Sequence, residues 1–136
     1  MKERVLILCT ANSARSQMAE GLLRDMAGDR FDVYSAGSQP SVVNPFAIKA
    51  MAQKDIDISG HSSDGLTQYL DQKFDYVITV CDNAAETCPV FPGKAERIHW
   101  GFPDPAAVEG SDEDILASFA EVRDGLEKTL RDWVSA

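Results

Sequence analysis

Short apolar segments alternate with segments of helical periodicity along most of this chain. Four of the apolar segments predict strands: 4–9, 31–37, 75–81 and 95–100. Helices are predicted between and after them: 15–28, 44–54, a short one within 57–70 and a long one from Ser111 onward. Alternation of this kind favours an α/β fold with one four-stranded parallel sheet flanked by helices.

Local signals at the helix ends agree with this pattern. Asn44 followed by Pro45 is typical of a helix start, and Gly28 suits a helix end. Ser111 and Asp114 resemble a capping box with aspartate in the glutamate position. The last helix then presents one apolar stripe: Ile115, Phe119, Val122, Leu126, Leu130 and Trp133.

Two predicted strands end on a cysteine, Cys9 and Cys81. The carboxyl ends of parallel strands lie at one edge of the sheet, and open α/β sheets bind their ligands outside that edge. We therefore expect both thiols at the same edge, beside a ligand site.

Length and charge limit the class of protein. A chain of 136 residues without a repeat or a linker-like stretch is expected to form one domain, 1–136. Its formal net charge of −9 argues against nucleic-acid or anionic-membrane binding, because phosphate backbones are held by a positive field. We find neither a signal-peptide core nor a membrane-length apolar run, so a cytoplasmic protein is expected.

The third cysteine is Cys88, which makes the number of thiols odd. A reducing cytoplasm keeps such residues as free thiols rather than as a disulfide framework. They are therefore either small buried apolar residues or thiols that take part in chemistry.

The stretch "CTANSAR" connects the first strand to a predicted helix start. Its small residues let successive backbone N–H groups converge on one point, where the helix end adds partial positive charge. Arg15 can bind an oxyanion through two parallel hydrogen bonds, and the same field is expected to lower the pKa of Cys9. Ser16 is a candidate hydrogen-bond donor to the sulfur. The alternative is that Cys9 is only a buried residue at a strand end.

These features predict an oxyanion site with a thiolate nucleophile. Its expected binding residues are consecutive: Thr10, Ala11, Asn12, Ser13, Ala14, Arg15 and Ser16.

The stretch "CTANSARSQMAEG" has Cys9, five further residues, and then Arg15 and Ser16. It resembles the phosphate loop of the low-molecular-weight protein tyrosine phosphatases and of the arsenate reductases that share their fold. The stretch from Cys81 through Cys88 to "HWGFPDPA" is similar to the thioredoxin-coupled arsenate reductases. The resemblance implies that Cys9 bonds arsenate, Cys81 attacks Cys9 and releases arsenite, and Cys88 attacks Cys81. It also implies thioredoxin as the reductant, although a glutaredoxin system stays open.

Asp104 in "FPDPA" matches the carboxylate that this family places over the loop. The resemblance implies a proton-transfer role there. Taken alone, an aspartate before a proline is also a common turn residue.

The resemblance further implies a possible potassium site that supports the loop, made by Asn12, Glu20, Ser35 and Asp64. Oxygen-bearing side chains suit such a hard cation. No tightly bound cofactor is expected. His61, His99, Trp100 and Trp133 are interpreted as structural residues.

Three alternatives remain open at this point. A phosphatase would need Cys9 and Asp104 but neither later cysteine. A non-catalytic anion-binding or phosphocarrier module would also use a strand-end cysteine, and zinc binding by Cys81, Cys88 and His99 has an unusual spacing. We expect a monomeric arsenate reductase, for which phosphate or sulfate are competing oxyanions. The segment 82–93 is expected to be mobile, because Cys81 must pair with two thiols in turn.

Overall fold

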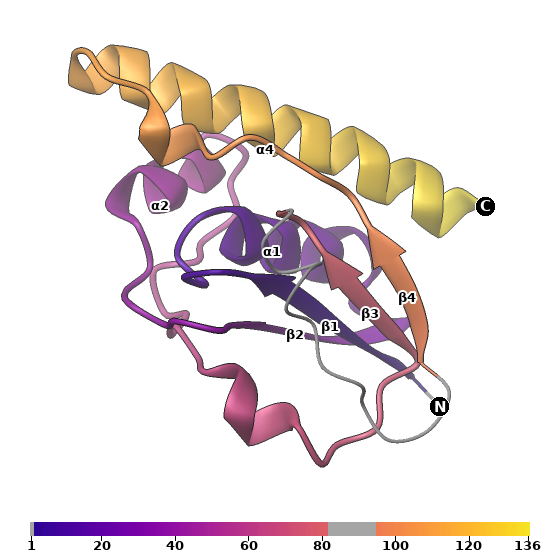
Figure 1. Ribbon diagram of the computed structural model, residues 1–136. Coiled ribbons are helices and arrows are strands. Elements are labelled where there is room, and N and C mark those ends of the chain that lie inside the picture. The colour runs from indigo at the N-terminus through magenta and orange to yellow at the C-terminus, as the bar shows by residue number, and fades with distance from the viewer. Residues whose placement is uncertain (1, 82–94) are drawn as a thin grey trace.

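The computed structural model describes residues 2–81 and 95–136, which are built around one parallel sheet (Figure 1). Its strands are β1 (Glu3–Cys9), β2 (Phe31–Gly37), β3 (Tyr76–Thr79) and β4 (Glu96–His99). They lie in the order β2-β1-β3-β4, and every neighbouring pair is parallel. The predicted four-stranded α/β sheet is therefore confirmed.

The central strand β1 is the most apolar of the four. Val5, Leu6 and Ile7 have no exposed surface. A strand between two neighbours is covered on both faces, which explains its unbroken apolar run. The register pairs Cys9 with Gly37 of β2 and Leu8 with Thr79 of β3. This register sets the end of β1 beside the ends of its neighbours.

The α-helices of the described residues are α1 (Arg15–Ala27), α2 (Pro45–Ala52) and α4 (Asp112–Ser135). They contact one another on one face of the sheet, where α4 crosses over α1 and α2 (Figure 1). On this face the Trp133 ring of α4 stacks on Phe31 of β2 with ring centroids 5.3 Å apart. The predicted stripe faces inward, since Phe119, Leu126 and Leu130 have no exposed surface.

The opposite face is covered by the chain between α2 and β3, which contains the 3-10 helix η1 (Leu66–Tyr69) (Figure 1). Tyr34 of β2 points to this side, where its ring lies 5.9 Å from Tyr69 and 6.0 Å from Phe74 between centroids. Side chains on both faces therefore bury the sheet, as a parallel sheet requires.

The helix-start predictions are confirmed in detail. The Asn44 side chain accepts a hydrogen bond from the Phe46 N–H, and Ser111 and Asp114 form both bonds of a capping box. Gly28 does close α1, although in a right-handed conformation with φ of −63°. Its missing side chain matters for space, because a Cβ there would lie 2.4 Å from the Arg24 carbonyl oxygen.

The element boundaries differ from the predictions by a few residues. β3 ends at Thr79, so that Cys81 lies two residues beyond the strand, and α2 ends at Ala52. Cys88 and the segment 82–93, which is predicted to be mobile, lie outside the described residues. None of the helices in the described part of the chain is both long and apolar enough to cross a membrane.

Candidate active site

The loop between β1 and α1 lies at the carboxyl edge of the sheet, as predicted. β1 ends on Cys9, five residues form the turn, and α1 starts at Arg15. Within the turn Asn12 has a positive φ of 46°, an uncommon conformation for a residue other than glycine. It is also fully buried, which indicates that surrounding contacts hold this conformation.

Donors outside the turn bind its carbonyl groups from one side. Each of four carbonyl oxygens has such a donor: Thr10 O accepts from Gln39 N at 2.9 Å, Ala11 O from Ser41 N at 3.2 Å and Ser63 Oγ at 2.9 Å, Asn12 O from Gln17 Nε2 at 3.0 Å, and Ser13 O from Asn44 N at 2.9 Å. A trans peptide turns its N–H opposite to its C=O. In each of these four peptides the N–H group is therefore directed away from the donor that binds the carbonyl. Three of the four residues that carry these N–H groups line the cavity described next: Ala11, Ser13 and Ala14.

A cavity of about 370 Å³ lies at this loop. It is lined by loop residues together with neighbours from two other segments: Cys9, Thr10, Ala11, Ser13, Ala14, Arg15, Asn44, Asp104 and Ala106. Six of these nine lining residues belong to the predicted thiolate and oxyanion loop. Backbone N–H groups at a helix start, with an arginine beside them, form a suitable site for an anion.

Arg15 and Asp104 line the same cavity although they are far apart in the sequence. The Arg15 guanidinium donates through Nη1 to the Phe102 carbonyl oxygen at 2.9 Å, which ties it to the segment before Asp104. The Asp104 side chain accepts from Ala106 N at 3.0 Å and caps the 3-10 helix η2 (Pro105–Ala107). Asp104 is therefore a turn residue and also lines the cavity of Cys9.

Cys81 lies against Cys9, as expected from the shared sheet edge. Both thiols are buried and not in a disulfide, with 5% of Cys9 and 3% of Cys81 exposed. The two side chains share a hydrogen bond, and Cys81 Sγ is 3.5 Å from Thr10 Oγ1. Two thiols this close together can form a disulfide once one of them is oxidised.

The loop lowers the pKa of Cys9 as predicted, through Arg15 and the Thr10 N–H, but two larger effects raise it above its usual value. The hydrogen bond to Cys81 raises the pKa of the Cys9 thiol, and burial raises it further. The Cys81 thiol disfavours the charged form of Cys9, and it lies outside the loop from which the prediction was made.

Ser16 also differs from its prediction as a donor to the sulfur. Its hydroxyl donates to Asn12 Oδ1 at 2.7 Å instead. The Asn12 side chain donates in turn to the Ser35 carbonyl at 3.4 Å. Ser16 and Asn12 thus support the loop from behind, and neither lines the cavity.

The predicted potassium residues are partly brought together. Asn12 bonds to the Ser35 carbonyl, and the Ser35 hydroxyl donates to Glu20 Oε1. The Asp64 carboxylate accepts from Ser62 Oγ at 2.8 Å, and the Asp64 carbonyl accepts from Gly37 N at 3.0 Å. Among the described residues no group of three or more histidine, cysteine or acidic side chains could hold a metal ion. The oxygen atoms of Asn12, Glu20 and Ser35 fit a weakly held hard cation by their chemistry.

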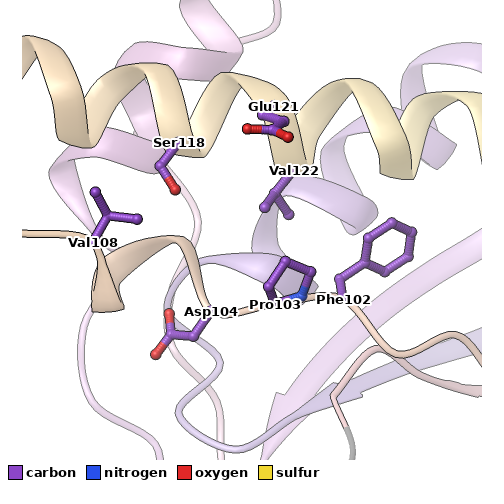
Figure 2. Close-up of a pocket in the computed structure, with 7 residues that line it drawn as sticks. All are labelled: Phe102, Pro103, Asp104, Val108, Ser118, Glu121 and Val122. Carbon is purple, nitrogen blue, oxygen red and sulfur yellow. The ribbon is translucent and has the colours of Figure 1, made fainter.

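A second cavity, of about 400 Å³, adjoins the first and shares Asp104 with it (Figure 2). It lies between α4 and the segment that precedes it, with Phe102, Pro103 and Val122 as apolar walls (Figure 2). Ser118 and Glu121 reach it from α4. Movement of the Phe102–Asp104 segment would therefore affect both cavities at once.

Sequence reasoning missed several residues that shape the loop. Ser41 and Ser63 both donate to the Ala11 carbonyl. They also bond to each other, because Ser41 N donates to Ser63 Oγ at 3.0 Å. Phe102 contributes only its carbonyl group, and Gln17 contributes a buried amide. No pattern in the sequence signals these roles, because each depends on a contact between distant segments. The Asn44–Pro45 pattern signals a helix start, but it does not signal the hydrogen bond from Asn44 N to the Ser13 carbonyl.

The site combines a cysteine at the end of a parallel strand, a loop of backbone N–H groups and an arginine at the start of the next helix. This combination defines a class of α/β proteins in which a thiol faces a bound tetrahedral oxyanion. Within that class, the family model described as low molecular weight phosphotyrosine protein phosphatase matches residues 4–136. The chain belongs to this family.

Similar proteins are named arsenate reductases. The chain is 51% identical to the arsenate reductase of Halalkalibacterium halodurans over 130 residues, which is 96% of this chain and 94% of the relative. A solved structure of an arsenate reductase in the phosphate-binding state superposes with a TM-score of 0.83 at 31% identity, covering 99% of this chain and 98% of that one. The thioredoxin-dependent arsenate reductase of Corynebacterium glutamicum superposes with a TM-score of 0.68 at 29% identity, covering 96% of this chain and 62% of that one.

Proposed function

We propose that this protein reduces arsenate to arsenite by passing oxidation along Cys9, Cys81 and Cys88, and that thioredoxin restores the thiols. The observation that carries the proposal is the contact between Cys9 and Cys81 at the base of the oxyanion cavity. A hydrolytic enzyme has no need of a second buried thiol there. The naming of the relatives as arsenate reductases supports the same reaction.

The first step is attack of the Cys9 thiolate on arsenic. Backbone N–H groups of the loop and the Arg15 guanidinium hold the arsenate oxygens and stabilise their charge. A sulfur–arsenic bond forms as one oxygen leaves. Asp104, which lines the same cavity, supplies the proton that lets this oxygen depart as water.

The second step moves two electrons to arsenic. The Cys81 thiolate attacks Cys9 Sγ, a disulfide forms between the two residues, and the electron pair of the broken sulfur–arsenic bond stays on arsenic. Arsenic leaves as arsenite, reduced from the +5 to the +3 state. The contact between the two thiols supports this step, because a disulfide requires close approach.

The third step regenerates Cys9. The Cys88 thiolate attacks Cys81, so that Cys9 leaves as a thiol and a Cys81–Cys88 disulfide remains. The dithiol of thioredoxin then reduces this disulfide by the same exchange chemistry. Cys88 lies outside the described residues, so its part rests on the sequence resemblance and on the thioredoxin-dependent relative.

Mass mapping of disulfides after addition of arsenate tests the relay. Wild-type protein is expected to accumulate the Cys81–Cys88 disulfide, and Cys88→Ser is expected to stop with Cys9 and Cys81 joined. Cys9→Ser should form no arsenate-dependent disulfide. Multiple turnover by Cys81→Ser or Cys88→Ser, measured as NADPH oxidation through thioredoxin reductase and thioredoxin, would contradict the relay.

Phosphatase activity is the second candidate, favoured by Asp104 at the cavity of Cys9. Such an enzyme would hydrolyse an aryl phosphate with Cys9 as nucleophile and Asp104 as general acid. Its activity would survive Cys81→Ser. Phosphate release that needs Cys9 and Asp104 but neither later thiol would therefore favour hydrolysis over reduction.

We also propose that potassium supports the loop, with oxygen atoms of Asn12, Glu20, Ser35 and Asp64 as its ligands. The ion would supply only electrostatic support to the turn from the side opposite the cavity. Thermal unfolding in potassium chloride and in sodium chloride of equal ionic strength tests this role. Stabilisation by potassium that is lost in Glu20→Gln is the expected result, and equal melting temperatures in both salts would contradict it.

A further inference from the structure

Gln17 is a fully buried amide directly behind the oxyanion loop, on the first turn of α1. Its Nε2 donates to the Asn12 carbonyl at 3.0 Å and to the Ser62 carbonyl at 2.9 Å. Its Oε1 lies 2.9 Å from His61 Nδ1. Both N–H donors of this amide and one of the two acceptor positions on its oxygen are thus used, so its orientation is fixed by its neighbours.

These contacts fix the orientation of the amide and the tautomer of the histidine. Carbonyl oxygens only accept, so Nε2 of Gln17 must face Asn12 and Ser62, and Oε1 must accept from His61 Nδ1. His61 Nε2 lies 3.1 Å from Arg24 Nη1, and a guanidinium only donates. His61 Nδ1 is therefore the donor to Gln17, and His61 Nε2 is the acceptor from Arg24.

The neighbouring carboxylate does not change this assignment. Glu20 Oε2 is 2.8 Å from Arg24 Nη2 and 3.6 Å from His61 Nδ1. The Arg24 contact is the shorter, so the carboxylate is bound by the guanidinium. The His61 N–H remains directed at Gln17, at the 2.9 Å distance of a hydrogen bond.

Asn12 is the loop position whose carbonyl is bound by a side chain alone. It has a left-handed φ of 46°, which asparagine adopts more readily than most residues, and its carbonyl accepts from Gln17, whereas the Thr10 and Ser13 carbonyls accept from backbone N–H groups. The Asn12 carbonyl and the Ser13 N–H belong to one rigid peptide plane. A donor that fixes the carbonyl therefore also fixes the direction of that N–H.

We propose that Gln17 is a positioning residue for oxyanion binding. Through the Asn12 carbonyl it aims the Ser13 N–H into the cavity, and His61, protonated on Nδ1, keeps the Gln17 amide in the required orientation. This inference rests on the proposed function only in so far as the loop binds a tetrahedral oxyanion.

Inorganic phosphate is the probe for the test, because its binding does not depend on the thiol relay. Isothermal titration of full-length protein in sodium buffer is expected to show phosphate affinity about tenfold weaker in Gln17→Met, as loss of one good hydrogen bond to an anion predicts. His61→Ala, which leaves Gln17 in place but frees its orientation, is expected to weaken phosphate binding severalfold. His61→Asn keeps an N–H at the Nδ1 position and should restore binding to within about twofold.

Gln53→Ala is the matched control, because it also removes a polar contact, with the Arg123 guanidinium at 2.7 Å, but away from the loop. It should lower the melting temperature and leave phosphate affinity unchanged. A merely structural role for Gln17 predicts the reverse pattern, in which binding is normal in every variant that folds. Should Gln17→Met fail to fold, the pair His61→Ala and His61→Asn decides the question.

Two nitrogen-15 NMR measurements complete the test. The His61 ring should show the Nδ1–H tautomer, and the Ser13 amide resonance should move in His61→Ala but return in His61→Asn. An Nε2–H tautomer, or unchanged phosphate binding in folded His61→Ala, would overturn the proposal. Wild-type protein that binds phosphate but fails to reduce arsenate would overturn the proposed function alone, whereas failure to bind phosphate would overturn both.

Discussion

Cys9 and Cys81 act as one titrating pair rather than as two separate thiols. Each is buried, they share a hydrogen bond, and loss of a proton from one disfavours its loss from the other. Within the pair, Arg15 favours the charged form of Cys9. Because the relay needs Cys9 charged first and Cys81 charged second, this sharing of one proton matches the order of the proposed steps.

The pairing makes a prediction about the reactivity of Cys9. Cys81→Ala removes the largest cause of its raised pKa, so the pKa of Cys9 should fall and the thiolate fraction at pH 7 should rise. The rate of Cys9 alkylation by iodoacetamide, followed by mass spectrometry across pH, is expected to reach half its maximum at lower pH than in wild type. Cys81→Ser also removes the second thiol, and its hydroxyl can donate to the Cys9 thiolate, so its midpoint should be lowered as well. A midpoint that stays at the wild-type value in Cys81→Ala would contradict this account.

Single residues were the hardest level to predict from sequence. Cys9 and Arg15 carry a recognisable spacing, Asp104 is predicted only by the family resemblance, and the structure brings all three to one cavity. The partner of the Ser16 hydroxyl and the role of Gln17 could not be predicted, because hydrogen bonds follow the final direction of each side chain. A change of a few tenths of an ångström decides which acceptor is reached.

The elements themselves were predicted well, because their signals are local. Apolar runs found all four strands of the sheet, and the two N-caps were found from Asn44 and Ser111. The end of β3 at Thr79 was missed by two residues. Val80 and Cys81 follow the strand but are still buried and apolar. The apolar run therefore continues past the last residue that pairs with a neighbouring strand, and composition does not mark where the strand ends.

The capping box at the start of α4 gives a prediction at the scale of one helix. Ser111 accepts from Asp114 N at 3.2 Å, and Asp114 Oδ2 accepts from Ser111 N at 3.2 Å. Ser111→Ala should lower the free energy of unfolding by about 1 kcal/mol, measured by urea denaturation. Ser135→Ala, at the other end of the helix, is the control and should change stability little. An unchanged urea midpoint in Ser111→Ala would show that the box contributes nothing.

Gly37 gives a second prediction, at the contact between β2 and the loop. A Cβ at this position would lie 2.4 Å from the Thr10 carbonyl oxygen and 2.8 Å from Asn12 N. Gly37→Ala is therefore expected to displace the loop and to weaken phosphate binding by at least an order of magnitude, as measured by titration calorimetry. Gly60→Ala, where no atom lies within 4 Å of the added Cβ, should bind as wild type does. Equal phosphate affinity in both variants would contradict the predicted close fit.

At the scale of the whole molecule, an acidic protein has to admit an anion. The formal net charge is −9, and the loop opposes it locally with backbone N–H groups and Arg15. The overall field repels arsenate at a distance, whereas the site attracts it at contact. These two effects differ in range, so salt affects the first more than the second.

The association rate of arsenate should therefore rise with ionic strength. Sodium chloride between about 10 and 200 mM shortens the screening length from about 30 Å to below 10 Å, which weakens the long-range repulsion. Stopped-flow measurement of arsenate binding tests this, with alkylation by neutral iodoacetamide as the control that should not respond. A rate that falls as salt is added would show instead that local attraction by the loop controls approach.

The hydrogen bonds to the loop carbonyls determine which side chains of the segment 39–44 can be substituted without loss of the loop's shape. Gln39, Ser41 and Asn44 bind Thr10, Ala11 and Ser13 through their backbone N–H groups, which every amino acid except proline possesses. Mutational drift in this segment can therefore replace its side chains while the turn keeps its shape. A homologue with an unrelated sequence at 39–44 would still be able to cradle an anion, and proline at 39 or 41 would mark one that had lost this support.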